Sequence, residues 1–466
     1  MSLRQILLAT TFLSVASVCA APAAMAADVK DDIAVLKEEN AELQKSLARL
    51  MSRLSQLEQK TAATAKAAEK VEAIADKVVT KADDGSFQLP GGTTVKLGGY
   101  AKLDVIHDVG MRPTSTGGTA DADVMSFTNI PLESDSVAGK RKHTTRVHAR
   151  QTRLNLATSS DTAWGKLKSF FEMDLFGTAG SALTNNPHTP RLRHAYVEFG
   201  EFLAGQAWST FQDTSAMANT LDMTGPVGTP PIRQAQLRYT HDFEDGNKLL
   251  LAVEEAEADI RDNTGGTNSN SITRWPDFVA QWRYDGSEGH VAFAGLLRNL
   301  AYDSGNVATG SQGDKNVWGY GLSLTGVWTP FKGYTGAYAK DNLYFRLAGG
   351  DGIGRYLAET AYSGAAVNQN TNHIDTQFAW GGYAGVQHYW MDTLRSTLVY
   401  GHAKMDLSDF IANTTTKEVD SVHTNLIWSP VPAMDIGAEY IYGRREVKSG
   451  EHGEVNRIQG SVTYRF

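Results

Sequence analysis

The chain has 466 residues and a formal net charge of -8, with 44 glycines, 17 tyrosines and 9 tryptophans. The acidic balance and the absence of a basic tract exclude a nucleic-acid-binding protein. The only cysteine is Cys19, and it lies in a segment that we expect to be removed. Disulfides, thiolate catalysis and cysteine-based metal sites are therefore excluded from the mature chain.

Residues 1–26 are predicted to form a secretory signal peptide. Arg4 supplies its basic region, an apolar core covers residues 6–18, and Ala24-Met25-Ala26 is a small-x-small cleavage site. The apolar core is too short to cross a bilayer as a helix. A lipoprotein site at Cys19 is a weaker alternative, because valine is a poor residue in front of it.

Residues 27–82 are predicted to form a periplasmic coiled-coil segment. A 3-4 spacing of mostly apolar residues is unbroken over 33–78, and leucines occupy every d position over 36–57. A coiled coil requires partner chains, so we expect an oligomer. A single amphipathic helix packed on its own domain is the alternative. Glycines and Pro90 break the helical pattern and mark a linker over residues 83–94.

Residues 95–466 alternate strands with turns, which predicts an all-β membrane domain. We expect strands near 95–107, 146–158, 164–176, 192–199, 201–207, 235–242, 247–256, 277–285, 289–299, 317–329, 341–349, 377–390, 393–406, 419–430, 434–446 and 455–466. Long connections alternate with short turns along the whole domain. This order is typical of an antiparallel transmembrane β-barrel of about 16 strands, with 14 and 18 as alternatives.

The carboxy-terminus and the tryptophans support an outer-membrane barrel. Apolar and polar residues alternate up to the closing Phe466, as in the final strands of bacterial outer-membrane barrels. Trp164, Trp328, Trp390 and Trp428 lie beside short turns, where an interfacial aromatic girdle belongs.

A barrel of this width encloses an aqueous channel, and the pleat determines which side chains face it. The pore-lining candidates for substrate binding are Lys102, Arg153, Arg238, Arg283, Arg298, Arg346 and Arg395; further inward cations are Lys166, Lys168, Arg457 and Arg465. The acids expected on the same face are Asp104, Glu172, Asp174, Glu198, Glu254 and Glu439. The planar fork of arginine suits carboxylates, so the excess of cations predicts anion selectivity. A neutralised structural network is the alternative.

The long connection over residues 208–234 is expected to fold inward and narrow the channel. It carries Trp208, Phe211, Asp213 and Arg233 beside a rigid stretch rich in proline and glycine. Rigid turns next to an arginine suit a constriction, although an ordinary external loop would have a similar sequence.

Together these features resemble the DcaP-like family of trimeric outer-membrane porins. The resemblance rests on the helical segment ahead of the barrel, on residues 97–104 and 205–211, on Arg233-Gln234 with Arg238-Tyr239, and on Phe466. It implies a homotrimer whose periplasmic helices form a three-stranded coiled coil. It also implies the passive uptake of small anions such as dicarboxylates.

The predicted function is that of a porin in the Gram-negative outer membrane, for passive diffusion of small, preferentially anionic solutes such as carboxylates. The expected partners are further copies of the chain, outer-membrane lipid and these solutes, with peptidoglycan as a further candidate. One alternative is a sugar-type porin, which needs a ladder of inward aromatics; Tyr100, Tyr196 and Tyr383 are the candidates. The other is a tether between the outer membrane and the cell wall.

An enzyme is not predicted, because the chain lacks a His-Glu-x-x-His, a Gly-x-Ser-x-Gly and a Walker loop. The glycine-rich stretch 350–354 has no strand-then-helix context, and the 12 histidines are scattered. We therefore expect no cofactor and no metal site.

Overall fold

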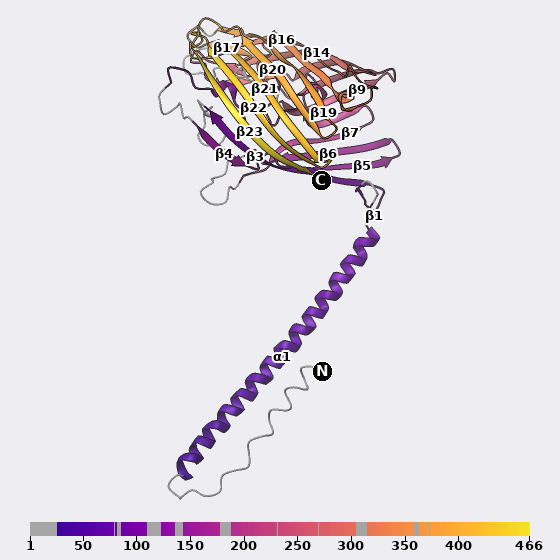
Figure 1. Cartoon of the computed structure of the whole chain (residues 1–466), viewed down its shortest axis with the longest axis vertical. Coiled ribbons are helices and arrows are strands. Elements are labelled where there is room, and N and C mark those ends of the chain that lie inside the picture. The colour runs from indigo at the N-terminus through magenta and orange to yellow at the C-terminus, as the bar shows by residue number, and fades with distance from the viewer. Residues whose placement is uncertain are drawn as a thin grey trace. The chain divides into compact units, whose positions relative to one another are not determined.

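The structure is a computed structural model that describes residues 26–78, 80–81, 85–109, 123–135, 143–177, 188–230, 232–268, 270–303, 315–357, 363–371 and 373–466. The predicted signal peptide lies outside the described residues up to position 25. The chain divides into two compact units, residues 1–80 and residues 81–466 (Figure 1).

The first unit contains one long helix, α1 (Ala26–Val78), of 53 residues. Its leucine seam is open to solvent: Leu43 is 69% exposed and Leu50 is 63% exposed. The helix is confirmed, whereas its association into a coiled coil stays a prediction. Among the described residues, no helix has both the length and the apolar character needed to cross a membrane.

The second unit is a closed antiparallel barrel of 16 strands, as the sequence predicts (Figure 1). Its strands are β3 (Thr94–Val109), β5 (Arg153–Thr162), β6 (Gly165–Asp174), β7 (Arg191–Phe199), β8 (Phe202–Trp208), β9 (Arg233–Asp242), β10 (Asn247–Glu254), β13 (Asp277–Gly286), β14 (Gly289–Tyr302), β15 (Lys315–Trp328), β16 (Asn342–Asp351), β19 (Phe378–Met391), β20 (Leu394–Met405), β21 (Thr416–Val431), β22 (Met434–Val447) and β23 (His452–Arg465). The last strand pairs with the first, with Arg457 opposite Asp108, and this pairing closes the barrel.

Short strands complete the sheet. β2 (Phe87–Gln88) pairs with the start of β3, and β4 (Thr144–His148) pairs with its end. β12 (Ser271–Ile272) extends the pairing of β14, while β11 (Ile260–Arg261), β17 (Ala365–Asn368) and β18 (His373–Thr376) form a separate sheet in the loops. β1 (Thr80–Lys81) precedes the barrel. We call the end of the barrel that bears the long connections the long-loop end, and the opposite end the short-turn end.

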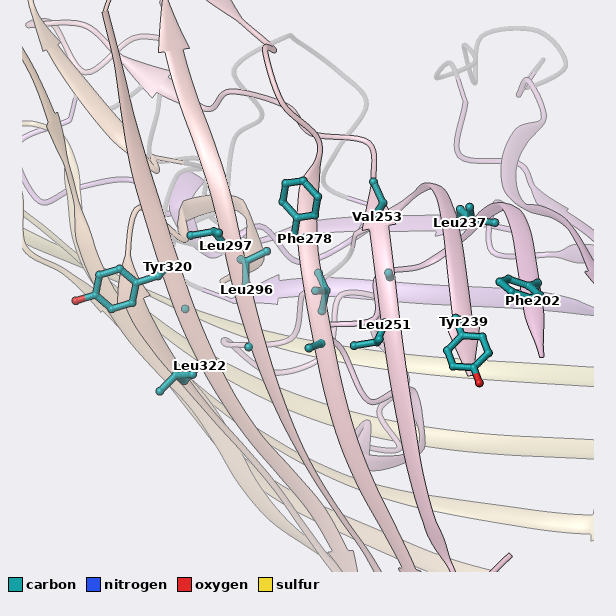
Figure 2. A pocket seen from close by; sticks show the side chains of 15 residues that line it. Phe202, Leu237, Tyr239, Leu251, Val253, Phe278, Leu296, Leu297, Tyr320 and Leu322 are labelled. Carbon is teal, nitrogen blue, oxygen red and sulfur yellow. The ribbon is translucent and has the colours of Figure 1, made fainter. Parts of the chain in front are cut away.

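The outer face of the barrel is apolar because alternate side chains point away from the channel. On β15, Leu322 and Leu324 are 53% and 40% exposed, whereas the intervening Ser323 is 2% exposed. A groove of about 680 Å³ crosses this outer face where Ala280 and Gly295 lie among larger residues of β8 to β15 (Figure 2). Its lining is almost wholly apolar, which suits an apolar environment around the wall and not the passage of polar solutes.

Residues 209–232, here called the inward loop, leave β8 and cross the interior of the barrel. The Tyr383 hydroxyl on β19 donates to the Ala216 carbonyl at 3.1 Å, and the Val227 amide donates to Ser421 on β21 at 2.9 Å. The Leu221 amide donates to Glu439 on β22 at 2.7 Å. Through these contacts the loop reaches the opposite wall from inside the barrel.

Candidate functional site

A polar cavity of about 540 Å³ lies between the inward loop, the segment 123–135 and the wall formed by β5, β6 and β7. Four arginines line it: Arg153, Arg191, Arg193 and Arg233. Glu172 is the one carboxylate among the lining residues that the structure describes. The cavity is therefore strongly basic, although the chain as a whole is acidic.

A β-bulge supplies two of the inward side chains. The register between β6 and β7 shifts after Glu172, so Arg193 is an extra residue between Leu192 and His194. As a result, Arg193 and His194 are adjacent in sequence and both buried, while Leu192 remains 45% exposed on the outer face. Arg191 and Arg193 were not among the pore-lining residues predicted from the sequence. The signal that could have found them is Leu192, an apolar residue between two arginines.

Arg191 and Arg193 are held by two carboxylates on β6. Arg191 makes a bidentate contact with Asp174, with Nε to Oδ1 at 3.0 Å and a terminal nitrogen to Oδ2 at 2.6 Å. Arg193 bridges Glu172 at 2.6 Å and Asp174 at 2.9 Å. Bidentate pairs of this kind fix the orientation of a guanidinium. Both acids are thus engaged by these two arginines.

Arg153 and Arg233 are less completely neutralised. The nearest ion-pair contact of Arg153 is Glu172 at 3.7 Å, and its Nε is buried without a hydrogen-bond partner. The Arg233 guanidinium lies 4.5 Å from the ring centre of Trp208, and no described carboxylate is within ion-pair distance of it. A guanidinium stacked on an indole keeps its N–H edge free for an anion.

The other predicted cations face the interior but do not line this cavity. Lys102 contacts Asp104 at 3.2 Å and donates to the Leu221 carbonyl of the inward loop at 2.6 Å. Arg395 pairs with Asp435 at 3.0 Å near the short-turn end. Arg238 also faces the interior, and its Nε is buried without a hydrogen-bond partner.

Arg298 and Arg346 are buried beneath the loops. Arg298 is 0% exposed, pairs with Asp259 at 2.8 Å and lies 3.7 Å from Asp277. Arg346 is 2% exposed and donates to the carbonyls of Gly228 and Tyr356. The pleat predicts their inward direction, but their burial leaves them no surface on the channel in this structure.

The residues predicted for the constriction divide into two pairs. Trp208 and Arg233 line the cavity. Phe211 is instead 1% exposed and packs against the ring of Tyr356, and Asp213 anchors the loop to the wall. The Asp213 carboxylate lies 2.6 Å from His290 Nε2 and 3.0 Å from an Arg283 terminal nitrogen.

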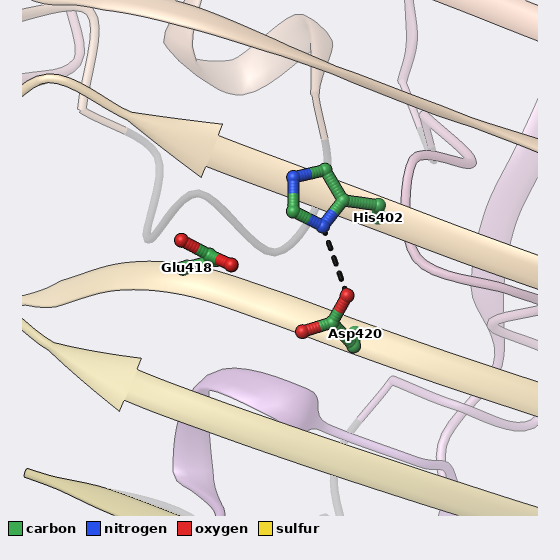
Figure 3. Close-up of side chains that lie close together, drawn as sticks. All are labelled: His402, Glu418 and Asp420. Atoms are coloured by element: carbon green, nitrogen blue, oxygen red, sulfur yellow. Dashed lines mark hydrogen bonds and ion pairs between the residues drawn. The ribbon is translucent and has the colours of Figure 1, made fainter.

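One group of side chains among the described residues has an arrangement that could hold a metal ion: His402, Glu418 and Asp420 (Figure 3). It lies on the outer face of β20 and β21, on the same side as Tyr400, and away from the channel. Lys404 already pairs with Glu418 at 3.0 Å, and the Tyr400 hydroxyl donates to Asp420 at 2.6 Å. These internal pairs satisfy the carboxylates, so we assign no metal to the group.

Comparison with known proteins identifies relatives of the chain. The family model described as DcaP outer membrane protein matches residues 22–466. The crystal structure of the outer membrane channel DcaP of Acinetobacter baumannii superposes with a TM-score of 0.67 at 23% identity, covering 82% of this chain and 99% of that one. An anion-selective porin from Comamonas acidovorans has a TM-score of 0.51 at 10% identity, covering 80% of this chain and 100% of that porin.

The porin Omp2b of Brucella canis is 24% identical over 230 residues, which are 48% of this chain and 61% of Omp2b. The chain thus matches about three fifths of the length of this relative. The structural neighbours share the barrel fold at low identity, so their likeness concerns the fold alone. The relatives are channels and porins, in agreement with the prediction that the chain is not an enzyme.

Proposed function

Because the chain belongs to the DcaP outer membrane protein family, we propose that it is an outer-membrane porin for the passive diffusion of small, preferentially anionic solutes. The observation that carries the proposal is the cavity beside the inward loop, where four arginines stand against two carboxylates, Glu172 and Asp174. Such an excess of fixed positive charge raises the local concentration of anions without any source of energy.

Arg153 and Arg233 are the proposed contacts for a carboxylate, because they are the arginines of the cavity with incomplete partners. A small dicarboxylate can engage one guanidinium with each end. Glu172 limits the affinity by competing for Arg153, and this keeps release possible. Arg191 and Arg193, fixed by Asp174, act as positioning residues that maintain a positive wall.

The proposal is tested by the reversal potential of the purified protein in a planar lipid bilayer under a salt gradient. We expect anion selectivity in the wild type. Arg153→Gln and Arg233→Gln should each lower the anion-to-cation permeability ratio by roughly two- to fivefold, the size typical of removing one partly exposed charge. They should also slow dicarboxylate flux into liposomes and leave sugar flux unchanged.

The matched control is Lys332→Gln, which removes the same charge from the exposed connection between β15 and β16, outside the barrel interior. A wild-type channel without anion selectivity, or an equal response of Lys332→Gln, would contradict the proposal.

A sugar-type porin is the second candidate, favoured by a run of rings on the same wall. Phe170 lies 5.7 Å from Tyr196 and 5.9 Å from His194, and His194 lies 5.7 Å from Trp208. Rings in sequence could provide a path for sugar faces. Faster swelling of liposomes with sugars than with carboxylates of similar size would favour this candidate.

We also propose that the chain forms a homotrimer in the outer membrane, with residues 27–82 in the periplasm. The exposed leucines of α1 support association of the helices. Binding of this segment to peptidoglycan would add a tethering role. Co-sedimentation of the intact protein with purified peptidoglycan, with and without residues 27–82, would decide that point.

A further inference from the structure

A second polar cavity lies on the same wall as the arginine cavity, nearer the short-turn end. It measures about 400 Å³ and is lined by Lys96, Lys166 and Lys168, with Tyr196 and Glu198. Hydroxyl groups of neighbouring serines and threonines complete its surface. We call it the lysine cavity. Phe170 lines both cavities, so they are neighbours along the wall.

The strand register places the two cavities in sequence along the barrel. Tyr100, Arg153, Asp174 and Arg191 face one another in one row across β3, β5, β6 and β7. Further toward the short turns, Thr94, Ser159, Lys168 and Glu198 form a parallel row on the same face. The two rows are about 20 Å apart, given the ordinary rise of a β-strand.

The lysine cavity carries unneutralised charge. Lys166 makes a long contact with Asp161 at 3.7 Å, and both side chains are exposed. Lys96 and Lys168 are also exposed, and they have no ion pair within the described part of the chain. Glu198, directly opposite Lys168 in the register, is the one carboxylate among the described lining residues.

We propose that the lysine cavity is a separate binding site for small carboxylates at the periplasmic mouth, which receives each solute as it leaves the arginine cavity. The proposal rests on the proposed porin function. An ammonium group is a strongly hydrated point charge, whereas a guanidinium binds carboxylates with a fixed fork. The second site therefore holds anions in a less fixed orientation, and two weak sites in series favour conduction over trapping.

The test is current block by a dicarboxylate, such as succinate, added to one side of a bilayer that contains one channel. The only cysteine of the chain is in the predicted signal peptide, so a single Asn370→Cys labelled with an impermeant thiol reagent reports which side the long loops face. In the variant Lys96→Gln/Lys166→Gln/Lys168→Gln, we expect a roughly fivefold weaker block from the periplasmic side. Block from the long-loop side, which meets the arginine cavity first, should change less than about twofold.

A second variant should change the current block in the opposite direction, and it leaves the size of the side chain unchanged. Glu198→Gln removes the acid of the lysine cavity, so block from the periplasmic side should strengthen. Lys332→Gln is again the control and should change neither side. An equal weakening from both sides, or no change in either variant, would overturn the proposal.

The proposal and the porin function on which it rests can fail separately. The lysine site alone is refuted if the lysine variant changes current block equally from both sides while Arg153→Gln and Arg233→Gln still lower anion selectivity. A wild-type channel without anion selectivity refutes the proposed function as well.

Discussion

Arginines of the same orientation have different roles in this barrel because their neighbours differ. Arg298 is enclosed by Asp259 and Asp277, whereas Arg233 has an indole and no described carboxylate beside it. A buried guanidinium with its carboxylates intact is a structural element whose removal leaves uncompensated charge. The number of inward arginines therefore overstates the number of sites available to a solute.

The inward direction of these arginines could be predicted from the sequence, but the carboxylates and carbonyls that neutralise or bury them could not. The direction of Arg298 and Arg346 follows from their apolar neighbours in the same strand. Their burial depends on Asp259, Gly228 and Tyr356, which belong to loops distant in sequence. No local pattern records which loop covers which side chain.

Asp123 gives the segment 123–135 a pH-dependent anchor. Burial opposes its ionisation, but hydrogen bonds from Arg150 and Arg146, at 2.9 Å and 3.1 Å, outweigh it and hold the pKa of this carboxyl below its ordinary range. A lowered pKa means that the stabilisation is present above the unfolded pKa of about 3.9 and is lost as the pH falls through the folded value.

We therefore expect the segment 123–135 to resist proteolysis at pH 5 as well as at pH 7. Asp123→Asn should increase cleavage in this segment at both pH values. The substitution removes the charged carboxylate to which Arg146 and Arg150 donate hydrogen bonds. Limited proteolysis followed by mass spectrometry measures the cleavage. Opening of the wild-type segment between pH 7 and pH 5 would contradict this assignment.

At the scale of elements, the alternation of apolar and polar residues and the lengths of the connections predict the strands. They do not predict irregularities such as β-bulges. The 16 strands follow from apolar and polar residues that alternate between turns. The bulge on β7 was not predicted. One extra residue in a strand moves every side chain after it to the opposite face of the sheet. Leu192 marks the outer face before the bulge, but Arg193 and His194 are both polar, so no apolar residue marks the point where the face changes.

The inward loop is held at its start by Asp213. Its carboxylate accepts hydrogen bonds from the Ser215 amide at 3.0 Å, from Arg283 at 3.0 Å and from Thr325 at 3.3 Å, and it contacts His290 at 2.6 Å. Hydrogen bonds to a charged group contribute about 1.5–3 kcal/mol each. The anchor ties the loop to β13, β14 and β15.

Asp213→Asn keeps the shape of the side chain and removes its charge. The inward loop should then fluctuate, which we expect to raise single-channel conductance and current noise and to weaken anion selectivity. Asp262→Asn, in a turn of another loop, is the control. If Asp213→Asn conducts as the wild type does, the loop is held by its contacts with the far wall alone.

At the scale of the whole molecule, the barrel satisfies its own hydrogen bonds, whereas the helix leaves an apolar seam exposed. The barrel closes on itself through β23 and β3, so its hydrogen bonding is complete within one chain. The helix α1 instead leaves Leu43, Leu50 and Leu57 between 61% and 69% exposed. A helix with such a seam gains stability by burying it against other helices, and further copies of the chain are the partners we propose.

Leu50→Asp tests that association, because it places a charge at a d position of the seam. Burying a leucine contributes about 1.5–3 kcal/mol per chain, so the loss in a trimer is several times larger than thermal energy. We expect dissociation of the oligomer at a lower temperature in unheated gels and by light scattering. Ser52→Asp places the same charge at an f position on the opposite side of the helix and should leave the oligomer intact. Equal stability of the two variants would mean that contacts between barrel walls alone hold the chains together, and that the exposed seam serves another partner.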